Sequence, residues 1–232
     1  MDIGIIGSGP VAQVLGGRLL DLGNAVMISS RDVDAGKDRG ARGVTLSARD
    51  WAATQTEKGN DGAAAGSFAA AAAFGELLIN ATAGKASLDA LSMAERRDFE
   101  GKIVIDLANP LDFSSGGLTL VFANTESLGE RLQQAYPGAR VVKTLNTVNV
   151  NVMIAPRDLP EETDMFVAGD DEAAKSWVTD TVLKGWFGWR RVIDLGDITA
   201  SRALEMYLPL WVRLLGATGT AKLNVRVVKA PG

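Results

Sequence analysis

The sequence predicts an α/β protein built on a doubly wound parallel sheet, with a short helical extension at its C-terminus. Three observations carry this prediction. A short apolar run at residues 3–6 leads directly into a glycine-rich turn, and strand-like and helix-like segments then alternate along the chain. Such alternation is typical of parallel strands joined by crossover helices, as in Rossmann-type folds. A strongly apolar helical segment, residues 199–215, follows the last expected strand.

The first thirty residues have the pattern of one strand–helix–strand unit. Residues 3–6 form a continuous apolar run, which is typical of a strand buried on both faces. Apolar residues then recur at helical spacing from Val11 to Leu22, and Gly23 with Asn24 supplies a stop signal. Residues 25–29 are expected to form the second strand.

The rest of the chain predicts further strands with helices between them, at residues 43–46, 77–81, 102–107, 140–145, 165–168 and 191–195. Helices are expected at residues 66–74, 171–183 and 199–215, the last kinked at Pro209 because proline removes a helical hydrogen bond. Periodicity is weakest over residues 47–62. No linker divides the chain, so residues 1–232 are expected to form one nucleotide-binding domain, with residues 197–232 as a helical extension and tail.

The composition narrows the possible chemistry. The 232 residues include no cysteine and no histidine, which excludes disulfides and thiolate sites and removes the commonest acid–base group at neutral pH. A cofactor that carries its own reactivity fits this gap, and no metal is expected. The net charge of −4 argues against a nucleic-acid partner. Because the sequence has no signal-peptide pattern and no apolar run of ~20 residues, a cytoplasmic protein without a membrane partner is expected.

A glycine-rich turn joins the first strand to the first helix. In its spacing, Gly7-x-Gly9-x-x-Ala12, the small residues allow a tight turn, close approach of a pyrophosphate to the backbone, and contact between helix and strand. Free N–H groups at the helix start suit phosphates, and Pro10 suits the first helical turn. The pattern therefore predicts a dinucleotide site, against the alternative of a tight turn without a ligand, at Gly7, Ser8, Gly9, Pro10, Val11 and Ala12.

The end of the second strand indicates which dinucleotide binds. NAD-binding proteins place an acidic residue here for the ribose 2′-hydroxyl, whereas an arginine accommodates the 2′-phosphate of NADP. This chain has Ser29, Ser30 and Arg31, two hydroxyls and a guanidinium that can donate to phosphate oxygens. NADP is therefore the expected cofactor. Asp32 is discordant and is expected to cap the next turn, and the alternative for Arg31 is a solvated loop position.

Ligands of open parallel sheets bind beyond the carboxyl ends of the strands. The residues after the fourth, fifth and sixth strands are therefore candidates for a cofactor cleft: Ala81, Thr82, Ala108, Asn109, Pro110, Asn146 and Thr147. Thr82 and Asn109 suit a ribose or a carboxamide, or else only cap their turns. Lys143 and Asn146 are the candidate catalytic residues, with Lys143 as a proton donor or an anchor for an anionic substrate. The alternative for Lys143 is a head group that reaches water at the end of the sheet.

Several segments together carry a family resemblance. They are the glycine turn at residues 7–12, Ser29-Ser30-Arg31, VVKTLNT at residues 141–147, AGDD at residues 168–171, and the segments 194–197 and 201–205. This series resembles the coenzyme F420-dependent NADP oxidoreductase family. The resemblance implies an enzyme that passes a hydride between NADPH and a deazaflavin (coenzyme F420) or a flavin, so the protein must align two rings and exclude water. Asn146 and Asn149 stand where that family has His and Pro, which predicts weak activity with the deazaflavin.

Two other functions stay open. An NADPH-dependent reductase of a small carbonyl or imine would need a side-chain proton donor, for which Lys143, Tyr136 and Tyr207 are available. An NADPH-binding sensor without turnover would use the apolar C-terminal helix as a partner surface. Because that helix is apolar on more than one face, a homodimer built on residues 199–215 and on the tail at residues 221–228 is also predicted.

Overall fold

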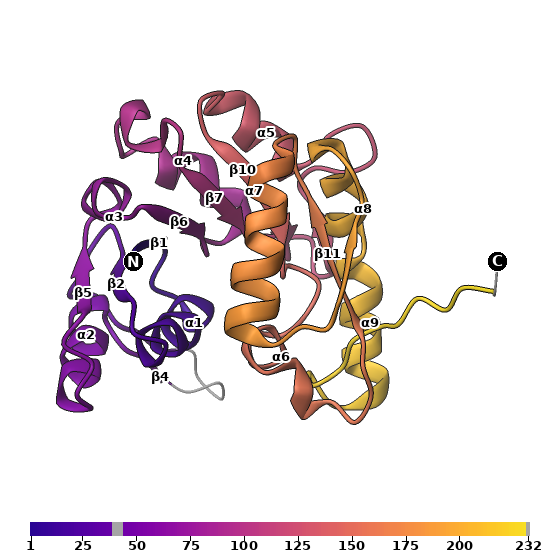
Figure 1. The fold of residues 1–232 in the computed structure, drawn as a ribbon, viewed down its shortest axis with the longest axis horizontal. Helices are drawn as coiled ribbons and strands as arrows, with labels where there is room; N and C mark the ends of the chain where they lie inside the picture. Colours follow the sequence, from indigo (N-terminus) through magenta and orange to yellow (C-terminus); the bar gives the residue numbers. More distant parts are fainter. Residues whose placement is uncertain (39–43, 231–232) are drawn as a thin grey trace.

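The computed structural model describes residues 1–38 and 44–230. Eight strands form one sheet in the order β12-β11-β10-β7-β6-β1-β2-β5, with helices on both faces (Figure 1). Two small antiparallel ribbons, β3-β4 and β8-β9, lie outside this sheet. The predicted α/β class, with a mostly parallel doubly wound sheet and a helical C-terminal region, is therefore confirmed.

The elements are short. The strands of the main sheet are β1 Asp2–Ile6, β2 Ala25–Ser29, β5 Ala63–Gly66, β6 Leu77–Asn80, β7 Ile103–Asp106, β10 Arg140–Thr144, β11 Asp164–Ala168 and β12 Arg191–Asp194. The ribbons are formed by β3 Lys37–Asp38, β4 Val44–Thr45, β8 Leu111–Asp112 and β9 Thr119–Leu120. The helices are α1 Pro10–Asp21, α2 Ala48–Glu57, α3 Phe68–Phe74, α4 Ser87–Leu91, α5 Leu128–Ala135, α6 Val150–Ile154, α7 Glu172–Trp177, α8 Ser201–Met206 and α9 Leu208–Thr218.

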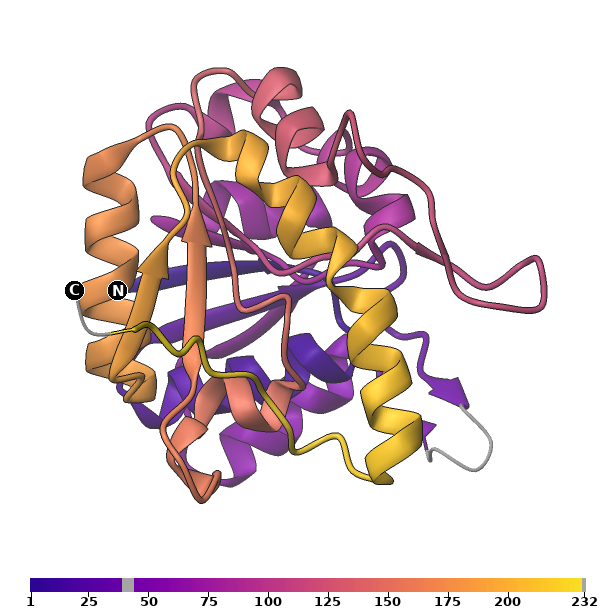
Figure 2. The same cartoon turned by 90° about the vertical axis from the view of Figure 1, so that its right-hand side faces the viewer.

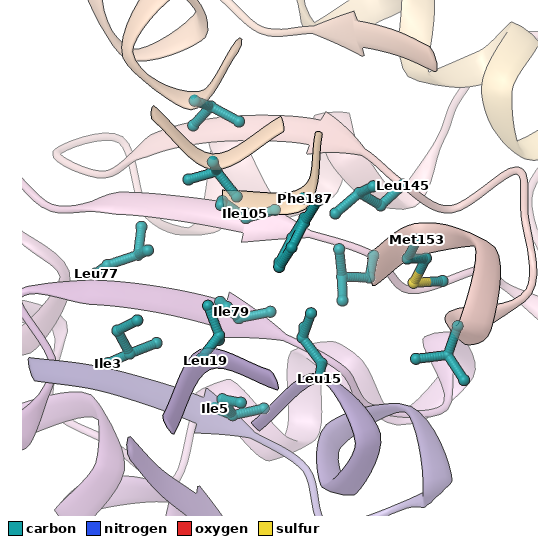
Figure 3. Packing of buried hydrophobic residues seen from close by; sticks show 14 of the residues in the cluster. Ile3, Ile5, Leu15, Leu19, Leu77, Ile79, Ile105, Leu145, Met153 and Phe187 are labelled. Atoms are coloured by element: carbon teal, nitrogen blue, oxygen red, sulfur yellow. The ribbon is translucent and has the colours of Figure 1, made fainter. Parts of the chain in front are cut away.

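Alternating side chains along the strands build two hydrophobic cores, one on each face of the sheet. Ile3 and Ile5 face the core covered by α1, α2, α6 and α7, whereas Ile6 faces the core covered by α3, α4 and α5. Figure 3 shows the first core, where Leu15 and Leu19 of α1 lie against the strands. Full burial of such a side chain stabilises the fold by roughly 1.5–3 kcal/mol, so the sheet is held mainly by these two layers.

The first strand–helix–strand unit forms as predicted. β1 pairs in parallel with β2 on one side and with β6 on the other, so the strand order reverses at β1. Gly23 has φ 83° and ends α1, and its amide donates to the carbonyl of Leu20 at 2.8 Å. Gly4 is required by packing, because a Cβ there would lie 2.1 Å from the carbonyl oxygen of Ala71 in α3.

Helix α2 occupies a region where the sequence predicted no element. Only three of its residues are buried, which leaves no clear apolar stripe to recognise: Ala48, Trp51 and Gln55. The helix is nevertheless capped, since the amide of Asp50 donates to the Ser47 hydroxyl at 3.0 Å. The indole N–H of Trp51 donates to the carbonyl of Gln13 at 3.1 Å and so fastens α2 to α1.

Strand β5 and the ribbon β3-β4 correct two further expectations. β5 consists of three alanines and a glycine, which are poor strand formers, and the helix expected from residue 66 begins at Phe68 instead. The strand expected at residues 43–46 does not join the main sheet, because Val44 and Thr45 pair antiparallel with β3. Residue 43 itself lies outside the described residues.

Strand β11 corrects the expectation of a wholly parallel sheet. It runs antiparallel to β10, with Lys143 opposite Ala168, while β12 is parallel to β11. The connection from β10 contains α6, a helix of 5 residues. The chain re-enters the sheet from the carboxyl end of β10.

The apolar C-terminal segment is helical with a break close to Pro209, as predicted, and the break at Tyr207 divides it into two helices. A 3-10 turn at Ile198–Ala200 leads into α8, and α9 begins at Leu208 with Pro209 in its first turn, where a missing N–H costs little. Figure 2 shows α8 and α9 following one another along one side of the molecule, with the loop around β8-β9 projecting beside them. The helix expected at residues 171–183 is α7, which continues as a π-helix over Val178–Phe187. Across residues 1–38 and 44–230, no helix combines the length and hydropathy that a membrane span requires.

Candidate active site

The glycine turn lies where the strand order of the sheet reverses. Gly7 has φ 130°, in the region that favours glycine, and a Cβ there would lie 2.7 Å from the carbonyl oxygen of Ala81. Ala12 is fully buried in the first core, where a larger residue would push α1 away from the strands. Both positions therefore need small residues for packing reasons alone.

The start of α1 leaves backbone donors available beside this turn. Gly9 is the N-cap and Pro10 the first helical residue. The helical hydrogen-bond ladder begins with the amide of Gln13, which donates to the carbonyl of Gly9 at 3.0 Å. The amides of Val11 and Ala12 consequently have no acceptor within the helix. An anion suits this position, since these donors and the helix dipole favour negative charge.

The end of β2 differs from the expectation at one residue. Ser29 is fully buried, and its hydroxyl donates to the carbonyl of Ile5 at 2.7 Å and accepts from the amide of Gly7 at 3.4 Å. That hydroxyl ties β2 to β1 and is not free to contact a phosphate. Ser30 is half-buried, Arg31 is exposed, and both remain as candidates.

Asp32 behaves as a turn-capping residue. Its carboxylate accepts from the amide of Asp34 at 3.0 Å, and its own amide donates to the Ser30 hydroxyl at 3.3 Å. This is the capping role expected for it.

A cleft of about 720 Å³ opens beside the turn, at the carboxyl ends of β6, β7 and β10. Its residues come from the start of α1, from residues 81–85 after β6, from Leu107 and Asn109 after β7, and from Asn146 and residues 148–150 after β10. The outer wall consists of Met153 from α6, Leu208 and Trp211 around α9, and residues 111–114 of the β8-β9 ribbon. This volume lies within the range typical of small-molecule sites.

Two asparagines hold each other at the inner end of this cleft. The side-chain amide of Asn109 donates to the backbone carbonyl of Asn146, and that of Asn146 donates to Asn109 Oδ1, both at 2.9 Å. Asn146 also donates to the carbonyl of Leu204 at 3.1 Å. Asn146 is only 3% exposed, and its Oδ1 has no partner among the described residues. A ligand with an N–H group would supply the missing hydrogen-bond donor to that oxygen.

The residue before Asn146 has an unusual backbone conformation. Leu145 has φ 61°, a region that bulky residues rarely adopt, although its side chain is buried in the first core. Such a conformation costs on the order of 1–3 kcal/mol and persists only where the surroundings hold it. Here it turns the chain sharply after β10, where Asn146 joins the cleft wall.

The remaining predicted positions divide into lining and supporting residues. Thr82 lines the cleft, and its hydroxyl bonds Asn80 Oδ1 at 2.8 Å and the Ser87 hydroxyl at 2.6 Å, as the turn-capping alternative anticipated. Ala81 also lines the cleft, together with Pro10 and Val11. Gly7, Ser8, Gly9 and Ala12 of the turn, Ser29, Ser30 and Arg31 at the end of β2, and Ala108, Pro110 and Thr147 are not among its lining residues.

Lys143 is buried and fully partnered, so its head group does not reach water as one alternative expected. Its ammonium contacts Asp106 Oδ2 and Glu205 Oε1 at 2.8 Å each and donates to the carbonyl of Ala108 at 2.5 Å. An ammonium has three N–H donors, and these three contacts use them all. Lys143 is not among the residues that line the cleft.

The three charges beneath the cleft stabilise one another. Burial by itself would lower the pKa of Lys143, but Asp106 and Glu205 outweigh it and the pKa is raised, so the lysine stays protonated. Burial raises the pKa of Glu205, while Lys143 acts in the opposite direction. Glu205 also accepts from the amides of Leu128 and Gly129 at the start of α5, at 2.9 and 3.1 Å.

Sequence reasoning missed several residues of this site. Asp106 and Glu205 were not singled out, although Asp106 interrupts its strand as Lys143 does and the two are register partners on neighbouring strands. Trp211 lies on the apolar segment 199–215, which was expected to contact a second copy of the chain, and in this structure it lines the cleft of its own chain. Leu208 and Trp211 are three residues apart and so lie on one face of α9, which is the signal that places them on the cleft wall.

Comparison with known proteins identifies the family. The family model described as NADP oxidoreductase coenzyme F420-dependent matches residues 2–110. A crystal structure of a candidate F420-dependent NADP reductase from Arthrobacter sp. FB24 is 42% identical, with a TM-score of 0.89, over 99% of this chain and 100% of that chain. The F420-dependent NADP reductase of Methanothermobacter thermautotrophicus is 23% identical over 100% of this chain and 96% of that protein.

A second curated relative matches the N-terminal part more closely. The F420-dependent NADP reductase of Methanocaldococcus jannaschii is 31% identical over 121 residues, which are 51% of this chain and 53% of that protein. This match therefore spans about half the length of the relative. Because the Arthrobacter structure matches over the whole chain, the conclusion does not depend on the N-terminal half alone. The chain belongs to the coenzyme F420-dependent NADP oxidoreductase family.

Proposed function

We propose that this protein is an NADP(H)-dependent oxidoreductase that transfers a hydride between NADPH and a deazaflavin of the F420 type. The observation that carries the proposal is a single cleft that runs from Val11 at the glycine turn to Asn146 after β10. A dinucleotide that starts at the turn would bring its reactive ring to the asparagine pair. The curated relatives named above are F420-dependent NADP reductases, which supports this acceptor class.

The available donors and acceptors suit NADP. The amides of Val11 and Ala12 are the candidates for the pyrophosphate, and Ser30 with Arg31 for the 2′-phosphate. The unpartnered Oδ1 of Asn146 suits the N–H of a nicotinamide carboxamide. The family name and these positions therefore point to the same cofactor, and Gly7, Gly9 and Pro10 shape the turn beneath it.

The chain's own part in the reaction is to align and to exclude water. When bound, NADPH supplies a hydride: its C–H bond breaks, a C–H bond forms on a ring carbon of the acceptor with both electrons, and a proton from solvent completes the reduction. Asn109 and Asn146 would orient the ring, while Met153, Leu208 and Trp211 would keep the wall apolar. Orientation and exclusion of water are the contributions a protein makes when cofactors carry the chemistry.

Reduction of a small carbonyl or imine by side-chain proton donation has less support. Lys143 has all three donors occupied, and neither Tyr136 nor Tyr207 is among the cleft residues. Burial raises the pKa of both tyrosine hydroxyls, which makes each a weaker proton donor. None of the three residues named for that role is therefore placed to donate a proton into the cleft.

NADPH oxidation with a panel of acceptors tests the proposal. The purified protein is mixed with NADPH and, separately, coenzyme F420, FMN or a cyclic imine, and the loss of NADPH is followed spectroscopically. Deuterium at C4 of NADPH is expected to appear in the reduced F420. Turnover with the imine but not with F420 would favour the carbonyl or imine reductase, and binding of NADPH without any turnover would favour a sensor.

We also propose that the protein is a homodimer built on α9. Leu208 is the single buried residue of this helix, although the helix is rich in leucine and Leu210 is 54% exposed. An uncovered apolar face of this kind suits a two-fold contact. Part of the tail from residue 221 packs against its own chain, since the backbones of Val225 and Val227 form hydrogen bonds with Asp164 at the start of β11. Light scattering at low micromolar concentration tests this, and Leu210→Glu should give a monomer.

A cytoplasmic location, and one domain over residues 1–232 with an extension at 197–232, stay predictions.

A further inference from the structure

A closed ring of contacts joins the buried charges to the asparagine pair. Glu205 contacts Lys143 at 2.8 Å, and Lys143 donates to the carbonyl of Ala108 at 2.5 Å. The next residue, Asn109, exchanges two hydrogen bonds of 2.9 Å with Asn146. Asn146 donates to the carbonyl of Leu204 at 3.1 Å, and Leu204 precedes Glu205 in the chain. The ring thus passes through β10, the turn after β7 and helix α8, and returns to its start.

Every side chain of this ring except that of Asn109 is almost completely enclosed. Lys143 is fully buried, Glu205 is 1% exposed and Asn146 is 3% exposed. Asp106 strengthens the ring from below, because it contacts Lys143 and also accepts from the amide of Ala108 at 3.1 Å. Both backbone groups of Ala108 are therefore held by charged side chains, which fixes the direction in which Asn109 leaves the strand. Hydrogen bonds to charged groups are among the stronger ones in proteins.

Glu205 is the link that ties this arrangement to the C-terminal extension. Its two carboxylate oxygens accept from the amides of Leu128 and Gly129, and one of them also contacts Lys143. Both oxygens thus face donors, so a glutamine of the same shape would set its NH₂ group against another donor. Arg202, one turn earlier on α8, pairs with Glu130 of α5 and also ties α8 to α5, but it has no contact in the ring.

We propose that Glu205 and Lys143 are positioning residues that set the place of the Asn109–Asn146 pair at the ring-binding end of the cleft. The proposal rests on the proposed function for its kinetic readout. Because hydride transfer depends steeply on the distance and angle between the reacting atoms, a small shift of this pair would slow the reaction while leaving the contacts at the glycine turn intact. The effect should therefore appear in kcat and not in the affinity for NADPH.

Glu205→Gln and Lys143→Met are compared with Arg202→Met, which removes the other α8–α5 tie. NADPH affinity is measured by titration, kcat by NADPH oxidation with coenzyme F420, and folding by thermal unfolding. The side-chain amide signals of Asn109 and Asn146 are followed by ¹⁵N NMR without any ligand. This last readout does not depend on turnover, so it stays informative if the proposed reaction is not observed.

Glu205→Gln and Lys143→Met should lower kcat at least tenfold, change NADPH affinity less than threefold, and shift both asparagine amide signals. Arg202→Met should lower thermal stability without moving those signals or kcat by more than twofold. If Glu205→Gln does not fold, Glu205→Asp gives the same comparison with the charge retained. Equal losses of kcat in the Arg202 and Glu205 variants, or unshifted asparagine signals in the Glu205 and Lys143 variants, would overturn the proposal. Absence of turnover in the unmodified protein would instead count against the proposed function.

Discussion

Asn109 and Asn146 bind each other through two hydrogen bonds of 2.9 Å, one donated by each side-chain amide. The pair connects the turns after β7 and β10, which are neighbouring parallel strands. The Asn146 amide donates both of its N–H groups, to Asn109 Oδ1 and to the carbonyl of Leu204, whereas the Asn109 amide donates one of its two. Asn146 Oδ1 is the acceptor of the pair that is left without a partner among the described residues.

The two asparagines should differ in how much they contribute to turnover. Asn146→Ala removes the free acceptor and the bond to Leu204, and a misplaced ring can cost about 10²-fold in rate. Asn109→Ala removes both hydrogen bonds of the pair but leaves Asn146 bonded to Leu204, so a loss of roughly tenfold is expected from a partial loss of alignment. Single-turnover oxidation of NADPH measures both, and the prediction fails if the Asn109 variant is the slower one.

Nucleotide preference should depend on Arg31 and Ser30 but not on Ser29. Arg31→Ala should reduce the preference for NADPH over NADH by roughly 10–100-fold, since a hydrogen bond to a charged group contributes about 1.5–3 kcal/mol. Ser30→Ala should have a smaller effect in the same direction. Ser29→Ala should leave the ratio of affinities unchanged and lower thermal stability, because its hydroxyl bonds the carbonyl of Ile5. Equal affinities for both nucleotides in the unmodified protein would contradict this assignment.

The glycine turn can be tested with two substitutions at the same helix. Gly9→Val places a branched side chain beside the amides of Val11 and Ala12, and it should abolish NADPH binding while circular dichroism stays close to that of the unmodified protein. Gly17→Ala is the control, since a Cβ there meets only Gln55 at 3.6 Å and alanine favours a helix by about 1 kcal/mol. Normal NADPH affinity in the Gly9 variant would place the nucleotide elsewhere.

Strongly patterned segments of the fold were predictable from sequence, and weakly patterned ones were not. β1, α1 and β2 follow the apolar spacing and the stop at Gly23 almost to the residue. α2 could not be predicted, because it is fastened by Trp51 and a capping serine and has no apolar stripe. β5 could not be predicted either, since its alanines gain strand structure only by pairing with β2. The reversed direction of β11 could not be predicted either, because apolar periodicity indicates a strand but not the direction in which it runs.

The candidate site, like the fold, was predictable from the sequence only in part. Position after a strand was enough to single out Asn109 and Asn146, because parallel strands end at one edge of the sheet. It was not enough to tell lining from supporting residues, as the buried hydroxyl of Ser29 and the enclosed ammonium of Lys143 demonstrate. The environments of these two side chains depend on partners that are distant in the sequence: Glu205, for example, lies 62 residues after Lys143.

Trp211 lies on α9, which both lines the cleft and is the proposed dimer helix, and a single substitution separates these two roles. It lines the cleft from α9, and its indole N–H is buried without a partner among the described residues. A carbonyl oxygen on the ring of the electron acceptor would accept a hydrogen bond from this N–H group. Trp211→Phe keeps an aromatic wall but removes the N–H, so KM for coenzyme F420 should rise roughly 2–12-fold, the range that one hydrogen bond of about 0.5–1.5 kcal/mol supplies.

Tyr207→Phe is the matched control for this variant. Tyr207 stands at the junction of α8 and α9 and also has a buried hydroxyl without a partner in the described part of the chain, yet it is not a cleft residue. Its removal should leave KM for the acceptor unchanged. Because α9 is also the proposed dimer helix, light scattering of both variants must accompany the kinetics. A rise in KM at constant mass supports the cleft role, whereas a monomeric mass for Trp211→Phe with KM unchanged would assign Trp211 to the contact between subunits.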